Sequence, residues 1–429
     1  MSPRISIQSG RVIDPAKGID DLLDVHIAEG RIAGLGQKPE GFDADQVIDA
    51  GGRIVCPGLV DLCARLREPG FEHKATIDSE SRAAAAGGIT TVCVPPDTYP
   101  IIDTPAVVRL IQAKAAMAGR VRIQVIGALT CGLKGQDLSE MSALRQAGCG
   151  AVSNAYAPVA NTLVLRRALE YAASHDLLVV VRPEDPDLAD HGCVHEGPVG
   201  TRLGLRGIPY AAETVAVAQV LALIEHTGAR VHFAQLSSAR AMRSIARAQE
   251  KGFPISADVA AHQLHLTDES VEGFDAQYHL RPPLRTRADR DALREGLRDG
   301  VIAAVCSDHQ PHEPDAKLDA FPATEPGLSG LQTLLPLTLQ LVETGALSLM
   351  QALAAVTQRP AAVMGLTAGT LQPGVPADIC VFDPDAVWTI SDESWLSAGR
   401  NTPFWSRTLK GRVTHTLQGG RPVFELDPR

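Results

Sequence analysis

The chain has 429 residues and a net charge of −10, and its content of 45% hydrophobic, 21% charged and 4% aromatic residues is typical of a folded globular protein. This length allows one large hydrophobic core and a smaller second one, because single α/β barrels often exceed the usual domain size. The negative charge and the absence of Lys/Arg clusters argue against a nucleic-acid partner, because binding to a polyphosphate requires clustered cations.

Short strands separated by turns dominate the first fifty-odd residues and return near the C-terminus. The expected strands cover residues 4–8, 10–14, 24–28, 30–34 and 46–49, and then 377–383, 387–390, 414–418 and 421–425. Two β segments at opposite ends of the chain predict one small sheet domain to which both ends contribute.

Between these segments, apolar strands alternate with amphipathic helices, which indicates a parallel sheet with crossover helices. The expected strands cover residues 91–94, 122–126, 151–153, 177–181, 230–234, 254–257 and 301–306. The expected helices cover residues 105–118, 163–173, 211–227, 238–251 and 287–299. Seven or eight such units fill a (β/α)8 barrel, whose functional residues follow the C-terminal ends of the strands.

The predicted fold class is therefore α/β. A TIM-type (β/α)8 barrel covers residues 57–369, and a small β-sandwich domain consists of residues 1–56 and 370–429. The N-terminus lacks the apolar stretch of a signal peptide and the aliphatic runs are too short to span a bilayer, so we expect a cytoplasmic protein without membrane contact.

The spacing of the cysteines agrees with a cytoplasmic location. Without CxxC spacing, the cysteines are expected to be reduced, mostly buried thiols rather than disulfides or a zinc cluster. There are eight: Cys56, Cys63, Cys93, Cys131, Cys149, Cys193, Cys306 and Cys380.

The most specific motif is Arg67-Glu-Pro-Gly70, which ends a run that begins at Pro57 and would leave the first barrel strand at its mouth. Other motifs follow in order along the chain. They include Gly87 to Thr91, Pro96 to Asp103, Glu184 to Pro186, Arg202 to Pro209, His232 to Ser237, Arg281 to Arg285, Ser307 to His312 and Arg400 to Phe404. Together they resemble the dihydroorotase branch of the amidohydrolases over essentially the whole chain.

That resemblance implies a two-zinc site, because two cations polarise an unreactive ring amide and lower the pKa of a bridging water. The zinc ligands would be neutral imidazoles and carboxylates. Only Asp308, which in the family binds metal and transfers the proton, is kept. The other aligned positions are Cys63, Arg65, Asn154, Ala155, Arg182 and Gln235.

These replacements predict that the chain holds no metal cofactor. A guanidinium has only donors, so neither Arg65 nor Arg182 can bind zinc, and an amide cannot replace the charge of a bridging carboxylate. Our hypothesis is that Arg65 and Arg182 instead neutralise Asp308. It requires hydrogen-bond distance between Asp308 and at least one of these arginines.

The substrate pocket of the family is altered too. Arg67, which by resemblance would pair with the dihydroorotate carboxylate, is present, but two pocket asparagines align with Asp97 and Arg281. Since these two replacements have opposite charges, we predict that Asp97 and Arg281 face each other across the old pocket and partly fill it.

The remaining histidines have a structural and a functional interpretation. His309 and His312 look like a metal cluster beside Asp308, but by resemblance this segment shapes the loop over the site, and a structural role is favoured. The same holds for His262 and His265. Cys63 is expected to be a small buried thiol, because no motif places a histidine base beside it.

No other catalytic signature is present in the sequence: there is no nucleophile elbow, no phosphate-binding loop and no dinucleotide fingerprint. The chain resembles the defective dihydroorotase-like proteins that some bacteria need to assemble aspartate carbamoyltransferase. We therefore expect a pseudoenzyme that acts as an assembly subunit for the catalytic chain of that enzyme in pyrimidine biosynthesis, and a homodimer.

Two alternatives stay open. One is a metal-poor or mononuclear cyclic-amide hydrolase that uses Asp308 as base, with Cys63 or His262 on a single metal. The other is a sensor that binds a pyrimidine intermediate through Arg67 without turning it over.

Overall fold

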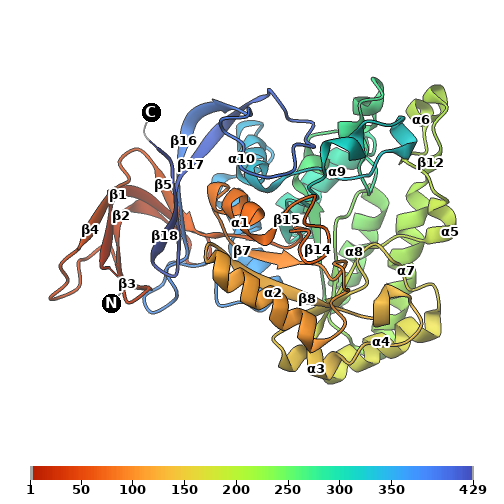
Figure 1. Cartoon of the computed structure of the whole chain (residues 1–429), viewed down its shortest axis with the longest axis horizontal. Coiled ribbons are helices and arrows are strands. Elements are labelled where there is room, and N and C mark those ends of the chain that lie inside the picture. Colours follow the sequence, from red (N-terminus) through yellow and green to blue (C-terminus); the bar gives the residue numbers. More distant parts are fainter. Residues whose placement is uncertain (1–2, 428–429) are drawn as a thin grey trace.

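A small sheet made from both ends of the chain stands beside a larger barrel in the computed structural model, which describes residues 3–427 (Figure 1). The hydrogen-bonded order of the sheet is β18-β17-β16-β5-β1-β2-β3, with β4 also paired to β1. Its strands are β1 (Ile5–Asp14), β2 (Ile19–Ala28), β3 (Arg31–Leu35), β4 (Gln46–Asp49), β5 (Ile54–Pro57), β16 (Ile379–Thr389), β17 (Thr408–Gln418) and β18 (Arg421–Glu425).

Four strands of this sheet, β1, β2, β16 and β17, are longer than the sequence pattern predicts, whereas β4 and β18 have the predicted bounds. Residues 4–8 and 10–14 were expected to be two strands but belong to the single strand β1, whose pairing shifts between Ile7 and Gly10, with Ser9 at a φ of 63°. In the same way β16 continues through an irregularity between Asp383 and Val387. The polar, turn-like residues at these points are bulges within strands.

The barrel consists of eight parallel strands in the order β15-β14-β13-β10-β9-β8-β7-β6. They are β6 (Leu59–Asp61), β7 (Ile89–Val94), β8 (Arg122–Ala128), β9 (Ala151–Ser153), β10 (Leu178–Val181), β13 (Val231–Phe233), β14 (Ile255–Ala260) and β15 (Ala304–Cys306). The first and last strands approach at Ala64 and His309, which form a bridge, and the buried Asp61 accepts a hydrogen bond from the Ser307 backbone at 2.8 Å. The predicted α/β barrel with a sheet from both chain ends is confirmed.

The five predicted helices are present. They are α2 (Pro105–Ala118), α4 (Thr162–Ser174), α7 (Tyr210–Thr227), α8 (Ala239–Glu250) and α9 (Arg287–Arg298). Further elements were not expected from the sequence: α1 (Ile77–Ala86), α3 (Met141–Gln146), α5 (Pro186–Ala189), α6 (Pro198–Leu203), α10 (Leu334–Glu343), α11 (Leu349–Val356), α12 (Gln358–Val363), and the short pair β11 (Val194–His195) and β12 (Gly207–Ile208). Helix α10 escapes a search for amphipathic periodicity because it is apolar on nearly all sides and buried.

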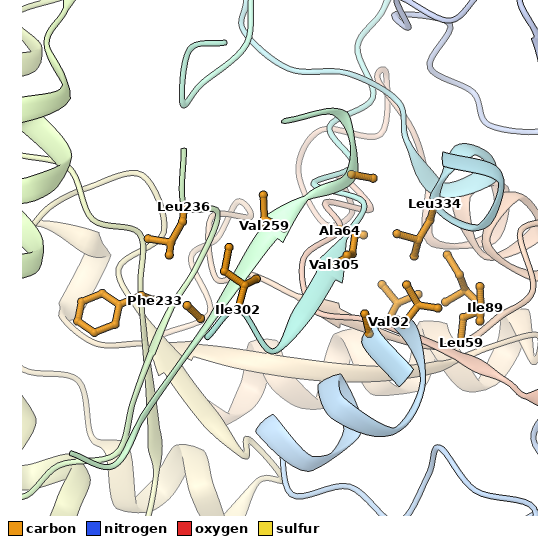
Figure 2. Close-up of a cluster of buried hydrophobic side chains, with 14 of the residues drawn as sticks. Leu59, Ala64, Ile89, Val92, Phe233, Leu236, Val259, Ile302, Val305 and Leu334 are labelled. Atoms are coloured by element: carbon orange, nitrogen blue, oxygen red, sulfur yellow. The ribbon is translucent and has the colours of Figure 1, made fainter. Parts of the chain in front are cut away.

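Alternate residues of the barrel strands enter two different layers. Val92, Phe233 and Val259 point outward and pack with the helices in one large cluster, part of which Figure 2 shows. Their sequence neighbours enter a second cluster inside the barrel, which includes Cys93 and Ala260. This two-residue period separates the inside of the barrel from its outside, and the parallel direction of the strands brings the residues that follow them to one end. No helix in the described part of the chain is long and apolar enough to cross a membrane.

Candidate functional site

The predicted site residues gather at the barrel mouth. These positions follow six different strands, and the C-terminal ends of parallel strands open on the same face of a barrel. Cys63 and Arg65 follow β6, Asp97 follows β7, Asn154 and Ala155 follow β9, Arg182 follows β10, Gln235 follows β13 and Asp308 follows β15.

Asp308 is the buried carboxylate at the centre of this set. Its Oδ1 atom accepts hydrogen bonds from Nε2 of Gln235 at 2.9 Å and Nε2 of Gln310 at 3.1 Å. Burial raises the pKa of Asp308 to about 7, although the nearby charges of Arg65 and Arg182 act in the opposite direction. The carboxyl group is therefore held mainly by neutral amides, and it titrates near neutral pH.

The hypothesis that Arg65 or Arg182 neutralises Asp308 at hydrogen-bond distance is wrong. The closest approach is 3.7 Å, between Nη1 of Arg65 and Oδ1 of Asp308. The Nε atom of Arg65 instead donates to Oδ2 of Asp97 at 2.7 Å. Asp97 lies in the loop after β7, the strand that pairs with β6, and so comes within reach of Arg65.

Asp97 and Arg281 were predicted to face each other across the pocket, but each is engaged by a different partner, Asp97 by Arg65 and Arg281 by Glu184. Arg281 donates two hydrogen bonds to the carboxylate of the buried Glu184, which also accepts one from Nη2 of Arg182 at 3.2 Å. These two guanidinium groups lower the pKa of Glu184 against the opposing effect of its burial. Glu184 thus supplies to Arg281 the negative charge that was expected from Asp97.

Tyr156 fills the space between these charged groups. The guanidinium carbons of Arg65 and Arg182 lie over its ring, 4.3 Å and 4.2 Å from the centroid. Its hydroxyl donates to the carbonyl oxygen of Arg281 at 3.0 Å and accepts from Nε2 of Gln310 at 2.6 Å. Burial raises the pKa of the Tyr156 hydroxyl, so the ring stays neutral.

Cys63 is a buried thiol beside Asp308, with its Sγ atom 3.9 Å from Oδ1. Nε2 of Gln235 donates to this sulfur at 3.0 Å. Burial raises the pKa of the thiol well above its ordinary value. Because the thiolate is the metal ligand and nucleophile, Cys63 is poorly suited to either role.

Asn154 and Ala155 shape the loop that carries Tyr156. Oδ1 of Asn154 accepts from the backbone and hydroxyl of Thr130, and its Nδ2 donates to the carbonyl oxygen of Ala157 at 2.6 Å. Ala155 has a φ of 48°, a left-handed conformation that turns the chain sharply. All polar atoms of Asn154 are thus used within the protein.

Arg67 lies at the edge of the site, and two of its guanidinium nitrogens already contact other groups of the protein. Its Nε donates to the carbonyl oxygen of Pro311 at 3.0 Å, and its Nη2 lies 3.2 Å from Nε2 of His312. Lys74 approaches the other ring nitrogen of His312 at 3.1 Å. Burial and these cations lower the pKa of His312 to about 2, so this histidine is neutral.

His309 and His265 take part in structural contacts. His309 lies 2.8 Å from Oε2 of Glu80 on α1, and His265 lies 2.8 Å from the carbonyl oxygen of Leu337. Neither ring nitrogen of the buried His262 has a hydrogen-bond partner within the described residues, and burial lowers its pKa to about 3.

A pair of zinc ions does not fit the donors present at the barrel mouth. Asp308 and a protonated thiol are accompanied there by Arg65, Arg182 and the amide of Gln235, which offer no anionic ligand. From residue 3 to residue 427, no group of three or more His, Cys, Asp or Glu side chains is placed to hold a metal.

Three residues in this network had no predicted role, namely Tyr156, Glu184 and Gln310. Glu184 and Gln310 stand in motifs that carry the resemblance, two positions after Arg182 and Asp308, and Tyr156 directly follows Ala155. The signal that could have found them is charge balance, because two arginines entering one buried site require an anion or an aromatic face within reach.

A parallel barrel with polar residues at its mouth occurs in many families, so the class of protein is shown by comparison with known sequences. Residues 52–241 match the family described as "Dihydro-orotase-like", and residues 327–424 match the family described as "Amidohydrolase family". The chain belongs to the dihydroorotase-like family of amidohydrolases.

Relatives of known sequence align with nearly the full length of this chain. The chain is 51% identical to a "Dihydroorotase-like protein" of Pseudomonas aeruginosa, over 98% of this chain and 99% of the relative. It is 46% identical to a "Dihydroorotase" of Syntrophotalea carbinolica, over 99% of each. Its fold is similar to that of the L-hydantoinase (dihydropyrimidinase) from Arthrobacter aurescens, with a TM-score of 0.87 and 23% identity over 99% of this chain and 96% of that one.

Proposed function

We propose that this chain is a non-catalytic dihydroorotase-like protein that serves as an assembly subunit for the catalytic chain of aspartate carbamoyltransferase. The observation that carries the first half is the position of Arg65. Its guanidinium is buried 3.7 Å from Asp308, where a metal-binding imidazole would be needed, and it cannot accept a metal. On this proposal the protein acts in pyrimidine biosynthesis, is located in the cytoplasm and holds no metal cofactor.

The network around Arg65 supports the same conclusion. Asp308, Glu184 and Asp97 each receive hydrogen bonds from side chains of the protein, and Tyr156 occupies the space between the two arginines. A substrate and two cations would have to displace several ion pairs at once. The name "Dihydroorotase-like protein" of the Pseudomonas aeruginosa relative agrees with a departure from the enzyme.

Metal content and turnover test the non-catalytic half. The purified protein is expected to hold far less than one zinc per chain after dialysis and to show no hydrolysis of dihydroorotate. The "Dihydroorotase" of Syntrophotalea carbinolica, measured in the same assay, is the positive control. Stoichiometric zinc together with turnover would reject the proposal.

The assembly role rests on the resemblance to defective dihydroorotases that accompany aspartate carbamoyltransferase. It predicts that the two proteins co-elute in size-exclusion chromatography after co-expression, with this chain present as a dimer. Separate elution would reject the assembly role and leave the non-catalytic assignment untouched.

A mononuclear hydrolase remains the second candidate. It is favoured by the pKa of about 7 of Asp308, a value suited to a general base, and by relatives named "Dihydroorotase". The raised pKa of the Cys63 thiol argues against it. A sensor that binds a pyrimidine intermediate through Arg67 is distinguished from both by isothermal titration with dihydroorotate, which would give heat without turnover.

A further inference from the structure

The space occupied by the ring of Tyr156, here named the Tyr156 slot, has the properties of a ligand site. It is bounded by the guanidinium groups of Arg65 and Arg182, the amide of Gln310 and the carbonyl oxygen of Arg281. We propose that this slot is a binding site for a neutral planar ring that carries a hydroxyl group, and that Tyr156 is its built-in occupant.

The walls of the slot select an aromatic face. Two guanidinium carbons within 4.3 Å of one ring centroid provide cation–π attraction, which a saturated ring of equal size cannot receive. Each guanidinium is fixed by an acidic partner, Arg65 by Asp97 and Arg182 by Glu184. The aromatic selectivity therefore belongs to the walls and does not depend on the presence of Tyr156.

The far end of the slot selects a hydroxyl group. The carbonyl oxygen of Arg281 accepts a hydrogen bond and the amide of Gln310 donates one, so a hydroxyl satisfies both while a hydrogen or methyl group satisfies neither. A neutral phenol fits better than a phenolate, because Asp308 lies close by and, with burial, raises the pKa of the Tyr156 hydroxyl.

The occupant is held less firmly than the walls. Arg65, Arg182 and Gln310 are buried, whereas Tyr156 is only half-buried and lies on the loop between β9 and α4. A cavity of about 50 Å³ lies against that loop, lined among others by Pro158 and Val159. The loop that carries the tyrosine thus has free volume beside it.

This inference rests on the proposed function in one respect, because it takes the site to bind a ring without turning it over. The two are separable by experiment: turnover of dihydroorotate by the unmodified chain would reject the proposed function, whereas failure of the Tyr156→Ala variant to bind phenol would reject the slot and leave the proposed function standing.

The test uses Tyr156→Ala in the full chain, with phenol as the probe because it replaces the atoms removed. We expect phenol to bind this variant at least about tenfold more tightly than it binds the unmodified chain, since the occupant no longer competes. Cyclohexanol, which has the hydroxyl but no π face, should bind about tenfold more weakly than phenol. Tyr99→Ala, which removes a tyrosine that is 71% exposed, is the matched control and should behave as the unmodified chain.

Equal affinity of phenol for the variant and the unmodified chain, or equal affinity of the variant for phenol and cyclohexanol, would overturn the proposal. If Tyr156→Ala is recovered unfolded, the readout is the folded yield on refolding with each probe. Rescue by phenol and not by cyclohexanol supports the slot, and no rescue by phenol overturns it.

Discussion

Arg65 and Asp97 form an ion pair at the barrel mouth, in which Nε of the arginine donates to Oδ2 of the carboxylate at 2.7 Å. The arginine side chain is 5% exposed and the aspartate side chain 23% exposed. The charge of the buried Arg65 is therefore balanced by the partly exposed Asp97.

Loss of Arg65 should destabilise the protein. Arg65→Met leaves Asp97 without its partner, and we expect the free energy of unfolding to fall by about 3–5 kcal/mol, as for other broken buried ion pairs. In urea unfolding at pH 7, a double-mutant cycle with Asp97→Asn should give a coupling energy of about 1–3 kcal/mol. Additive effects of the two substitutions would contradict the pairing.

The carboxyl group of Asp308 should make stability depend on pH. Its pKa is about 7 in the folded protein and about 3.9 in an unfolded chain, so the folded state holds the proton more tightly and loses stability as pH rises through this window. Relative to Asp308→Asn, the unmodified chain should therefore lose about 2.5 kcal/mol between pH 5 and pH 8. Urea unfolding of both proteins at the two pH values measures this difference, because other titrating groups cancel. A constant difference would show that Asp308 is ionised throughout.

Asn154→Asp should not restore a metal ligand. The amide donates to the carbonyl oxygen of Ala157, and a carboxylate at the same position would face that oxygen without a proton. We expect a loss of about 1–3 kcal/mol in the free energy of unfolding and no gain in zinc binding. Asn161→Asp is the matched control: Oδ1 of Asn161 only accepts hydrogen bonds at the start of α4, where a negative charge is favourable, so stability should be unchanged or higher. Equal effects of both substitutions would contradict this account.

The outward layer of the barrel strands should dominate stability. Phe233 on β13 is fully buried against the helices, and Phe233→Ala should cost about 3–5 kcal/mol. Met117→Ala on α2 removes a side chain that is 87% exposed and should change stability by less than about 0.5 kcal/mol. Thermal and urea unfolding of both variants provide the comparison.

The fold was predictable where periodicity is strong. The bounds of α2 agree with the sequence pattern at both ends, because Pro105 fixes its start and Gly119 its end. Helices α10 and α11 were missed because their buried faces extend around most of the helix, so that the chain shows no polar stripe. The continuous strands β1 and β16 were divided in the prediction because bulge residues resemble turns.

At the site, the positions were predictable but the partners were not. The sequence places Arg65, Arg182 and Asp308 after different strands, and the structure brings them to one end of the barrel. Which carboxylate each arginine contacts depends on side-chain direction and on loop shape, and neither follows from spacing. Arg281 was therefore assigned to Asp97, although Glu184 lies within its reach.

Strand β5 lies between a strand from the beginning of the chain and one from its end. Ile54 pairs with Phe382, which the ribosome adds about 330 residues later. At about 5–20 residues per second, the edge of β5 stays unpaired for on the order of 15–65 s of translation. The whole barrel is thus synthesised as an insertion within an unfinished sheet, and a nascent chain stopped before β16 would expose that edge to aggregation.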